Sequence, residues 1–391
     1  AAAAEAGVRR IVYLGGLTAE RAGSEHLKSR AETGDILRQG SVPVTEVRAP
    51  IVIGPGSAAF EVMRDVAAHL PIFPAPTAVR NPTPPVAIDD LVADLMALAQ
   101  KPEAAGQIYD TAGPERLGYD RMIGEIADAL GRRRPIILPV PGLSPGIAGL
   151  GLPLVSATPA TVARALIAGM QDDLKADDSK LRALVPRATA DFRTAAARAF
   201  DHEQRRLSAG EFREGAYDLR GHRPDVSFYA KQLQRSVETP APPEAVWHTL
   251  ARIGTLEDGY FFLSPIWDLR RAVDQRLGGH SESPREAGTD PAPGERFDMW
   301  EVVAADRPRR LLIKGQMVAP GEGGMQVDLD ETDAGGTRLT IMMYWHPAGP
   351  GGLLYWYKLL PAHAVMVRGM AKEIVRLAER AGAQAPTAAG A

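Results

Sequence analysis

The sequence contains no cysteine. That absence excludes disulfide bonds, catalysis by a thiolate, and zinc or iron–sulfur sites with cysteine ligands. In the C-terminal part of the chain, His280, His346 and His363 lack the spacing of a metal-binding motif such as HExxH. We therefore predict no metal site. A chain without cysteine fits a reducing compartment, and we expect a cytoplasmic protein.

An excess of charge of one sign and a long apolar run are also missing. The formal net charge is −3, and no basic run with interleaved aromatic residues occurs, so nucleic acid is not an expected partner. The longest apolar stretch, residues 136–157, is interrupted by prolines and glycines, which indicates an irregular loop and not a membrane span. The chain starts AAAAEAGVRR, with neither an initiator methionine nor a signal sequence, and we expect it to be incomplete there.

The length and the patterning favour two domains. A chain of 391 residues is too long for one hydrophobic core. Residues 1–207 alternate short β-rich runs with stretches of helical spacing, one of which has Ser24 as its expected N-cap, and residues 160–206 are expected to be helical. This alternation is typical of a parallel α/β sheet. The expected strands lie at residues 10–14, 43–53, 107–111 and 135–138.

The pattern changes beyond residues 208–225, a polar, glycine-containing segment that we interpret as a linker. Apolar and polar residues then alternate at 325–330 and 339–345, which predicts long antiparallel strands. An amphipathic helix is expected at 353–381 and a disordered tail at 382–391. Residues 226–381 are therefore predicted to form a second domain of the α+β class.

The first domain resembles a known enzyme family through an ordered series of motifs. They are GVRRIVYLGGL, SEHLKSRAETGDIL, PVTEVRAPIVIGPG and IDDLVADLMALAQKPEAAGQIYDTAGPERLGYDRMI. The series resembles the latter two-thirds of an atypical, extended short-chain dehydrogenase/reductase, with kin among NmrA-like and nucleoside-diphosphate-sugar-epimerase-like proteins of bacteria. The resemblance implies a Rossmann-like sheet that lacks its first strands, and NAD or NADP as the cofactor.

The glycine-rich turn that binds the cofactor phosphates in this family is missing. Its glycines follow the first strand and let the backbone approach the pyrophosphate at a helix N-terminus. No GxGxxG or GxxGxxG follows a strand near the start of this sequence, and the glycines at 146–151 and 321–324 are interpreted as turns. We expect this chain alone to bind NAD or NADP weakly or not at all.

The resemblance also assigns candidate site residues. Active family members carry Tyr-x-x-x-Lys on the helix after the strand that corresponds to RIVYL, and His26 and Arg30 occupy those positions here. A histidine can transfer a proton near neutral pH, whereas an arginine keeps its proton but can hold a ribose hydroxyl or a phosphate. His26 and Arg30 are the candidate catalytic residues; the alternative is a helix-surface pair without catalytic role. The candidate cofactor-binding residues are Gly15, Arg30, Pro50, Ile51 and Val52.

The second domain resembles the START-like superfamily, also called SRPBCC or helix-grip. The resemblance is carried by PAPPEAVW, by the alternating strands and by WHPAGPGGLLYWYKLLPAH. It implies a curved antiparallel sheet around the C-terminal helix, with a cavity for an apolar ligand between them. The candidate lining residues are Trp300, Met317, Met343, Trp345 and Tyr357, with Trp356 beside them. The alternative is that these side chains simply fill the core.

Two hypotheses about function follow. In the first, the protein is an NAD(P)-dependent oxidoreductase that acts on a small molecule, and its second domain binds an apolar ligand. In the second, the protein is a non-catalytic sensor of NAD(P) redox state or of a ligand, or a scaffold. The replacement of the Tyr/Lys pair favours this second hypothesis. The sequence does not fix the substrate, the choice between NAD and NADP, or the oligomeric state.

Overall fold

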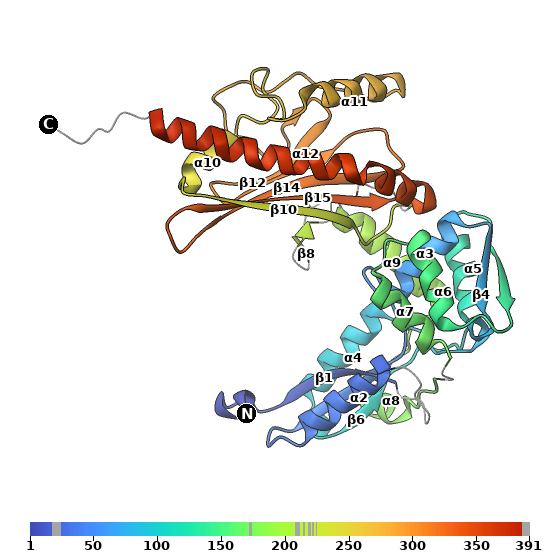
Figure 1. The fold of residues 1–391 in the computed structure, drawn as a ribbon. Helices are drawn as coiled ribbons and strands as arrows, with labels where there is room; N and C mark the ends of the chain where they lie inside the picture. Colours follow the sequence, from blue (N-terminus) through green and yellow to red (C-terminus); the bar gives the residue numbers. More distant parts are fainter. Residues whose placement is uncertain are drawn as a thin grey trace. The chain divides into compact units, whose positions relative to one another are not determined.

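A computed structural model describes residues 1–17, 25–171, 174–207, 212–213, 216–217, 220, 223 and 225–384 (Figure 1). The chain divides into two compact units. Unit 1 comprises residues 1–205 and 227–229, and unit 2 comprises residues 206–226 and 230–391. In the described part of the chain, no helix is both long and apolar enough to span a membrane.

Unit 1 is built on parallel strands, which confirms the predicted α/β class. Strands β1 (Ile11–Gly16), β2 (Val44–Ala49) and β6 (Ile108–Asp110) form a sheet in the order β1-β2-β6, with both pairs parallel. Two further parallel pairs join β3 (Val52–Ile53) to β5 (Val86–Ala87), and β4 (Ile72–Pro76) to β7 (Ile136–Val140).

Helices connect most of these strands. Because parallel strands run in the same direction, the chain must return to the same end of the sheet before each new strand begins. Buried side chains such as Phe60, Met63, Met122, Ile126 and Phe192 form the main core of the unit. The helices are α1 (Ala2–Glu5), α2 (Glu25–Arg38), α3 (Ala58–His69), α4 (Ile88–Gln100), α5 (Tyr119–Ala129), α6 (Pro145–Gly151), α7 (Ala160–Gly169), α8 (Ser179–Leu184) and α9 (Phe192–Leu207).

Three local predictions for unit 1 need correction. The single strand expected at 43–53 is divided into β2 and β3 at Pro50, whose nitrogen carries no hydrogen for a sheet hydrogen bond. The strand expected at 135–138 is present as β7, but the rest of the loop expected at 136–157 contains α6, because Pro145 stands in the first turn and the Ser144 hydroxyl caps the Ile147 N–H. The helical stretch at 160–206 comprises three helices, α7, α8 and α9. The expected cap Ser24 lies outside the described residues.

Unit 2 is an antiparallel sheet with a long helix, so the expected period-two strands are present. The sheet order is β10-β15-β14-β13-β12-β11, and all neighbouring strands run antiparallel. The strands are β10 (Lys231–Thr239), β11 (Arg296–Phe297), β12 (Trp300–Asp306), β13 (Arg310–Gly315), β14 (Gly321–Glu331) and β15 (Thr337–Pro347), and the helices are α10 (Pro243–Leu250), α11 (Ser264–Arg276) and α12 (Gly349–Gln384). Within the segment interpreted as a linker, β8 (Phe212–Arg213) pairs with β9 (Ala216–Tyr217).

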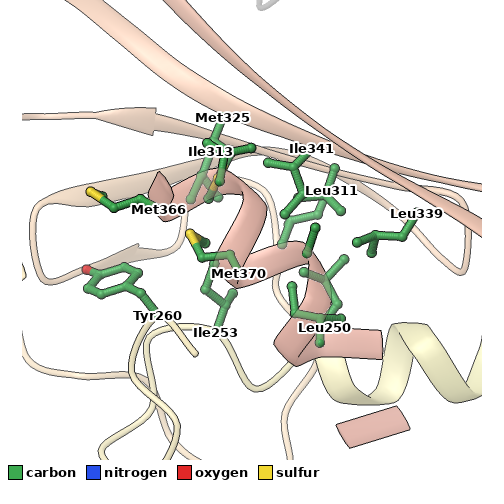
Figure 2. Packing of buried hydrophobic residues seen from close by; sticks show 14 of the residues in the cluster. Leu250, Ile253, Tyr260, Leu311, Ile313, Met325, Leu339, Ile341, Met366 and Met370 are labelled. Carbon is green, nitrogen blue, oxygen red and sulfur yellow. The ribbon is translucent and has the colours of Figure 1, made fainter. Parts of the chain in front are cut away.

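The core of unit 2 lies between the sheet and α12, which crosses one face of it (Figure 1). Met366 and Met370 of α12 lie against Ile313, Met325 and Ile341 of the sheet (Figure 2). The helix runs from Gly349 to Gln384, and so it is longer than the expected 353–381. Residues 382–384 continue this helix and do not belong to a tail, although Gly382 has low helix propensity. Residues 385–391 lie outside the described part.

A buried ion cluster holds α3 to α9 in unit 1. The Arg64 guanidinium lies 2.7 Å from a Glu61 oxygen and 2.8 Å from a Glu203 oxygen. The Arg64 and Glu61 side chains are each only 1% exposed and that of Glu203 is 6% exposed. Charges removed from water in this way are tolerated only while they remain paired.

Replacing Arg64 should therefore destabilise unit 1. Arg64→Met leaves Glu61 and Glu203 buried without their cation, and we expect a loss of about 3–5 kcal/mol in the free energy of unfolding. Chemical denaturation followed by circular dichroism measures it. The matched control is Arg134→Met, which breaks a solvent-exposed pair with Asp128 and should leave stability nearly unchanged. Equal stability of Arg64→Met and the wild type would contradict the prediction.

Candidate functional site

A cavity of about 670 Å³ lies in unit 1, where β1 and β2 end. Because the two strands are parallel and paired from Ile11 with Val44 to Gly16 with Ala49, their carboxyl ends meet at one edge of the sheet. Such edges are where open α/β sheets bind ligands. All five candidate cofactor-binding residues line this cavity: Gly15, Arg30, Pro50, Ile51 and Val52.

Glycine at the end of β1 allows α2 to approach the strand closely. A Cβ atom placed on Gly16 would lie 3.3 Å from Cδ of Arg30 and 3.5 Å from a methyl carbon of Leu27. The Tyr13 hydroxyl on β1 also donates a hydrogen bond of 2.9 Å to the backbone oxygen of Arg30. A methyl group at position 16 would contact Leu27 at an ordinary distance and would require the Arg30 side chain to shift by a few tenths of an ångström.

The cavity has a mainly apolar wall with few polar side chains. Arg30 is the only charged residue among its described lining residues, and hydroxyl groups come from Ser57, Tyr119 and Thr161. Burial raises the pKa of Tyr119, so its phenol stays protonated across the physiological range. A protonated phenol in such a wall can donate a hydrogen bond to an oxygen atom of a bound molecule.

Tyr119 and Thr161 were not predicted from the sequence. Both come from elements far along the chain from α2, the start of α5 and the start of α7, and no spacing connects them to His26 or Arg30. His26 itself stands one helical turn before Arg30 on α2. The His26 side chain lies outside the part of the chain that the structure describes.

A second cavity, of about 290 Å³, lies within unit 2. Four of the five candidate residues line it, Trp300, Met317, Met343 and Trp345, together with Trp356. Tyr357 does not line it and is 47% exposed, so this assignment was wrong. The reason is the phase of α12: Trp356, Leu359, His363 and Met366 recur at helical spacing on the lining face, and Tyr357 is rotated about 100° from Trp356.

His363 is a titratable side chain of this second cavity whose pKa is shifted by its surroundings. Burial lowers the pKa of its imidazole, which is therefore neutral at neutral pH. Its ring lies 5.7 Å from the Trp356 ring, centroid to centroid, at an interplanar angle of 45°. Over the described ranges of the chain, no group of three or more His, Asp or Glu residues could hold a metal ion.

Comparison with known proteins gives a family match for unit 2 only. Residues 229–370 match a family described as a protein of unknown function, DUF2867. No curated protein matches the sequence.

Solved structures similar to this chain cover about half of it. A nucleoside-diphosphate-sugar epimerase from Staphylococcus aureus is 15% identical, with a TM-score of 0.40 over 50% of this chain and 67% of its own. An NADPH-dependent quinone oxidoreductase from Escherichia coli is 18% identical, with a TM-score of 0.41 over 51% and 70%. A triphenylmethane reductase from Citrobacter sp., solved with NADP(H), is 16% identical, with a TM-score of 0.40 over 51% and 67%.

The lowered pKa of His363 predicts a pH dependence of stability in unit 2. In the folded protein the pKa of His363 lies below the ordinary 6.5, so the unfolded chain binds the proton more readily. The free energy of unfolding therefore falls as the pH drops below about 6.5. His363→Asn should remove this contribution while leaving stability above that pH nearly unchanged. Denaturation of both proteins at a series of pH values between about 7.5 and 5.5 measures the difference. Parallel pH profiles for the two proteins would refute it.

Proposed function

We propose that unit 1 binds the nicotinamide end of NAD or NADP and acts as an NAD(P)-dependent oxidoreductase on a small molecule. The observation that carries the proposal is the cavity of about 670 Å³ at the ends of β1 and β2. It gathers Gly15, Arg30 and the Pro50–Val52 backbone, the positions that the family resemblance assigns to the cofactor. Its volume is in the range of small-molecule sites.

The residues present fit one end of the cofactor. A flat nicotinamide ring suits the glycine-containing wall at Gly15 and Gly16, and the Arg30 guanidinium is suited to hold a ribose hydroxyl or the adjoining phosphate. The sequence provides no glycine-rich turn between a strand and a helix for the pyrophosphate. The nicotinamide and its ribose are therefore the part of the cofactor that these residues would recognise.

The chemistry assigns distinct tasks to the side chains. A bound nicotinamide supplies or accepts a hydride. Tyr119 donates a hydrogen bond to the substrate oxygen, because a phenol is protonated at physiological pH and burial raises its pKa further. Arg30 binds and orients but transfers no proton. His26 is the proposed proton carrier, because an imidazole can exchange a proton near neutral pH.

For unit 2 we propose a START-like, helix-grip module that binds an apolar small molecule. The support is an antiparallel sheet crossed by the long helix α12, with a cavity of about 290 Å³ between them and α11. Trp300, Met343 and Trp345 of the sheet contribute to its wall. These three large apolar side chains are among the candidate lining residues named from the sequence.

A second candidate function is a redox or ligand sensor without turnover. The observation that favours it is the pair His26 and Arg30 in place of tyrosine and lysine. A sensor needs the cofactor pocket of unit 1 but no proton transfer, so binding without reaction would identify it.

Binding of the nicotinamide end can be tested with reduced nicotinamide mononucleotide and NADH. By calorimetry on the full chain, we expect the mononucleotide to bind weakly and NADH to bind no more tightly, because the adenosine half finds no phosphate cradle. Arg30→Ala should weaken mononucleotide binding about tenfold, the value of one charged hydrogen bond. The control is Lys28→Ala, an exposed residue of the same helix that does not line the cavity. Binding unaffected by Arg30→Ala would exclude this site.

Turnover separates the enzyme from the sensor. If the protein is a reductase, aldehydes, ketones or quinones should oxidise the reduced mononucleotide in its presence. His26→Ala should then lower kcat by about a hundredfold or more, the usual loss for a general acid. Tyr119→Phe removes only the phenol hydroxyl, and it should lower kcat without weakening mononucleotide binding. Binding with no turnover on any of these carbonyl compounds supports the sensor, and a fully active His26→Ala protein places the proton donor elsewhere.

A further inference from the structure

Aromatic side chains surround the cavity of unit 2. The Trp267 and Trp300 rings lie 6.0 Å apart, centroid to centroid, at 64°, and the Trp345 and Tyr355 rings lie 5.1 Å apart at 32°. Trp356 completes the set from α12. Flat rings on several sides form walls against which another flat ring can stack or meet edge to face.

The aromatic walls are held in place by the backbone and by polar contacts. A Cβ atom on Gly321 would lie 2.6 Å from the Trp345 ring, so this indole rests directly on the main chain of β14. The Trp345 Nε1 also donates a hydrogen bond of 2.9 Å to the Gly352 backbone oxygen. A ring fixed in this way cannot easily rotate into the cavity and fill it.

On the other side, an ion pair fixes α11, which carries Trp267. Arg271 Nε and Nη2 lie 2.6 and 2.9 Å from the two oxygens of Asp298. The Tyr260 hydroxyl donates to the same carboxylate at 2.5 Å, and the Tyr260 ring lies 4.4 Å from that of Trp267. The position of Trp267 is therefore set by contacts outside the cavity, and the space beside it persists without a ligand.

Four nitrogen atoms of the lining residues lack a hydrogen-bond partner among the residues that the structure describes. They are Nε1 of Trp267 and Nε1 of Trp300, whose side chains are 6% and 3% exposed, together with Nε of Arg270 and Nδ1 of His363. An indole N–H is a donor only, so it calls for an acceptor such as a carbonyl oxygen. Buried polar atoms without a partner are rare in folded proteins, and an absent ligand is one reason for them.

The charged lining residues already have partners. Arg270 lies 3.1 Å from Asp274, and Glu322 lies 3.4 Å from Lys314. A ligand therefore needs no net charge to match this wall, and a free carboxylate would compete with existing pairs. The volume also limits the ligand: about 290 Å³ is roughly twice that of a protein cavity known to hold one benzene ring, about 150 Å³.

We infer that this cavity binds an uncharged, planar aromatic molecule of two or three rings that carries one hydrogen-bond acceptor for Trp267. The inference rests on the proposed apolar-ligand function of unit 2 and narrows it to one chemical class. The ligand would enter past α11, where Ile266, Leu269 and Val273 both line the cavity and are 40–64% exposed to solvent. Apolar residues at the mouth lower the cost of bringing an apolar molecule out of water.

Three probes separate this class from other apolar ligands. Coumarin has two planar rings and a carbonyl acceptor, naphthalene has two planar rings without an acceptor, and decanoic acid is a flexible chain with a charge. Calorimetric titration of the full chain should rank coumarin first. We expect naphthalene to bind about fivefold more weakly for want of one hydrogen bond, and decanoic acid to bind most weakly.

Two variants test the site and one serves as the control. Trp267→Phe keeps an aromatic ring but removes the N–H, so it should abolish the preference for coumarin while naphthalene still binds. Ala362→Trp places a large ring at an exposed lining position of α12 and should prevent binding of both probes. Val365→Trp adds the same ring at an exposed position of α12 outside the cavity and should bind both probes normally.

The outcomes separate the aromatic ligand class from the broader apolar-ligand function proposed for unit 2. If decanoic acid binds as tightly as coumarin and Ala362→Trp blocks it, unit 2 is an apolar-ligand module but the aromatic class is wrong. An undiminished coumarin preference in Trp267→Phe overturns the assigned hydrogen bond. If none of the three probes binds, or if Ala362→Trp and Val365→Trp behave alike, both the class and the ligand-binding function of unit 2 fail.

Discussion

Parallel pairing of β1 with β2 is the constraint on which the candidate site of unit 1 depends. Since the two strands run in the same direction, Gly15 and Gly16 pair with Arg48 and Ala49 at the end of β2, and the chain that leaves β2 enters the cavity wall at Pro50. Glycine at position 16 then lets α2 approach until Arg30 borders the same space. Without this register, the residues that would hold a nicotinamide would not share one edge of the sheet.

In unit 2 the corresponding constraint is the packing of α12 on an antiparallel sheet. Alternation sends Met325, Val327 and Leu329 of β14 to the buried face, where they form one cluster with residues of the helix. Toward the N-terminal part of α12 the facing residues become aromatic and are fixed by the main chain, and the packing leaves a cavity. The same sheet and helix thus form a closely packed core at one end and a cavity at the other.

The sequence predicted what depends on local pattern. Strand alternation placed Met343 and Trp345 on one face, because a period of two leaves a strand residue only two faces, whereas Trp300 was named through the family resemblance. The prediction failed for Tyr357, since its face depends on where α12 begins and on a rotation of about 100° per residue. Tyr119 and Trp267 were not predicted as site residues, because only tertiary packing brings α5 and α11 to the two cavities. The division at Pro50 was foreseeable from the missing N–H.

The central claim is that the nicotinamide end of the cofactor occupies the cavity at the ends of β1 and β2. A crystal structure of the full chain soaked with reduced nicotinamide mononucleotide tests it most directly. The account predicts density for the ring between the Gly15–Gly16 and Pro50–Val52 backbones, with the ribose or phosphate within hydrogen-bond distance of Arg30. Density for the mononucleotide at another place, or an empty cavity at saturating concentration, would contradict it.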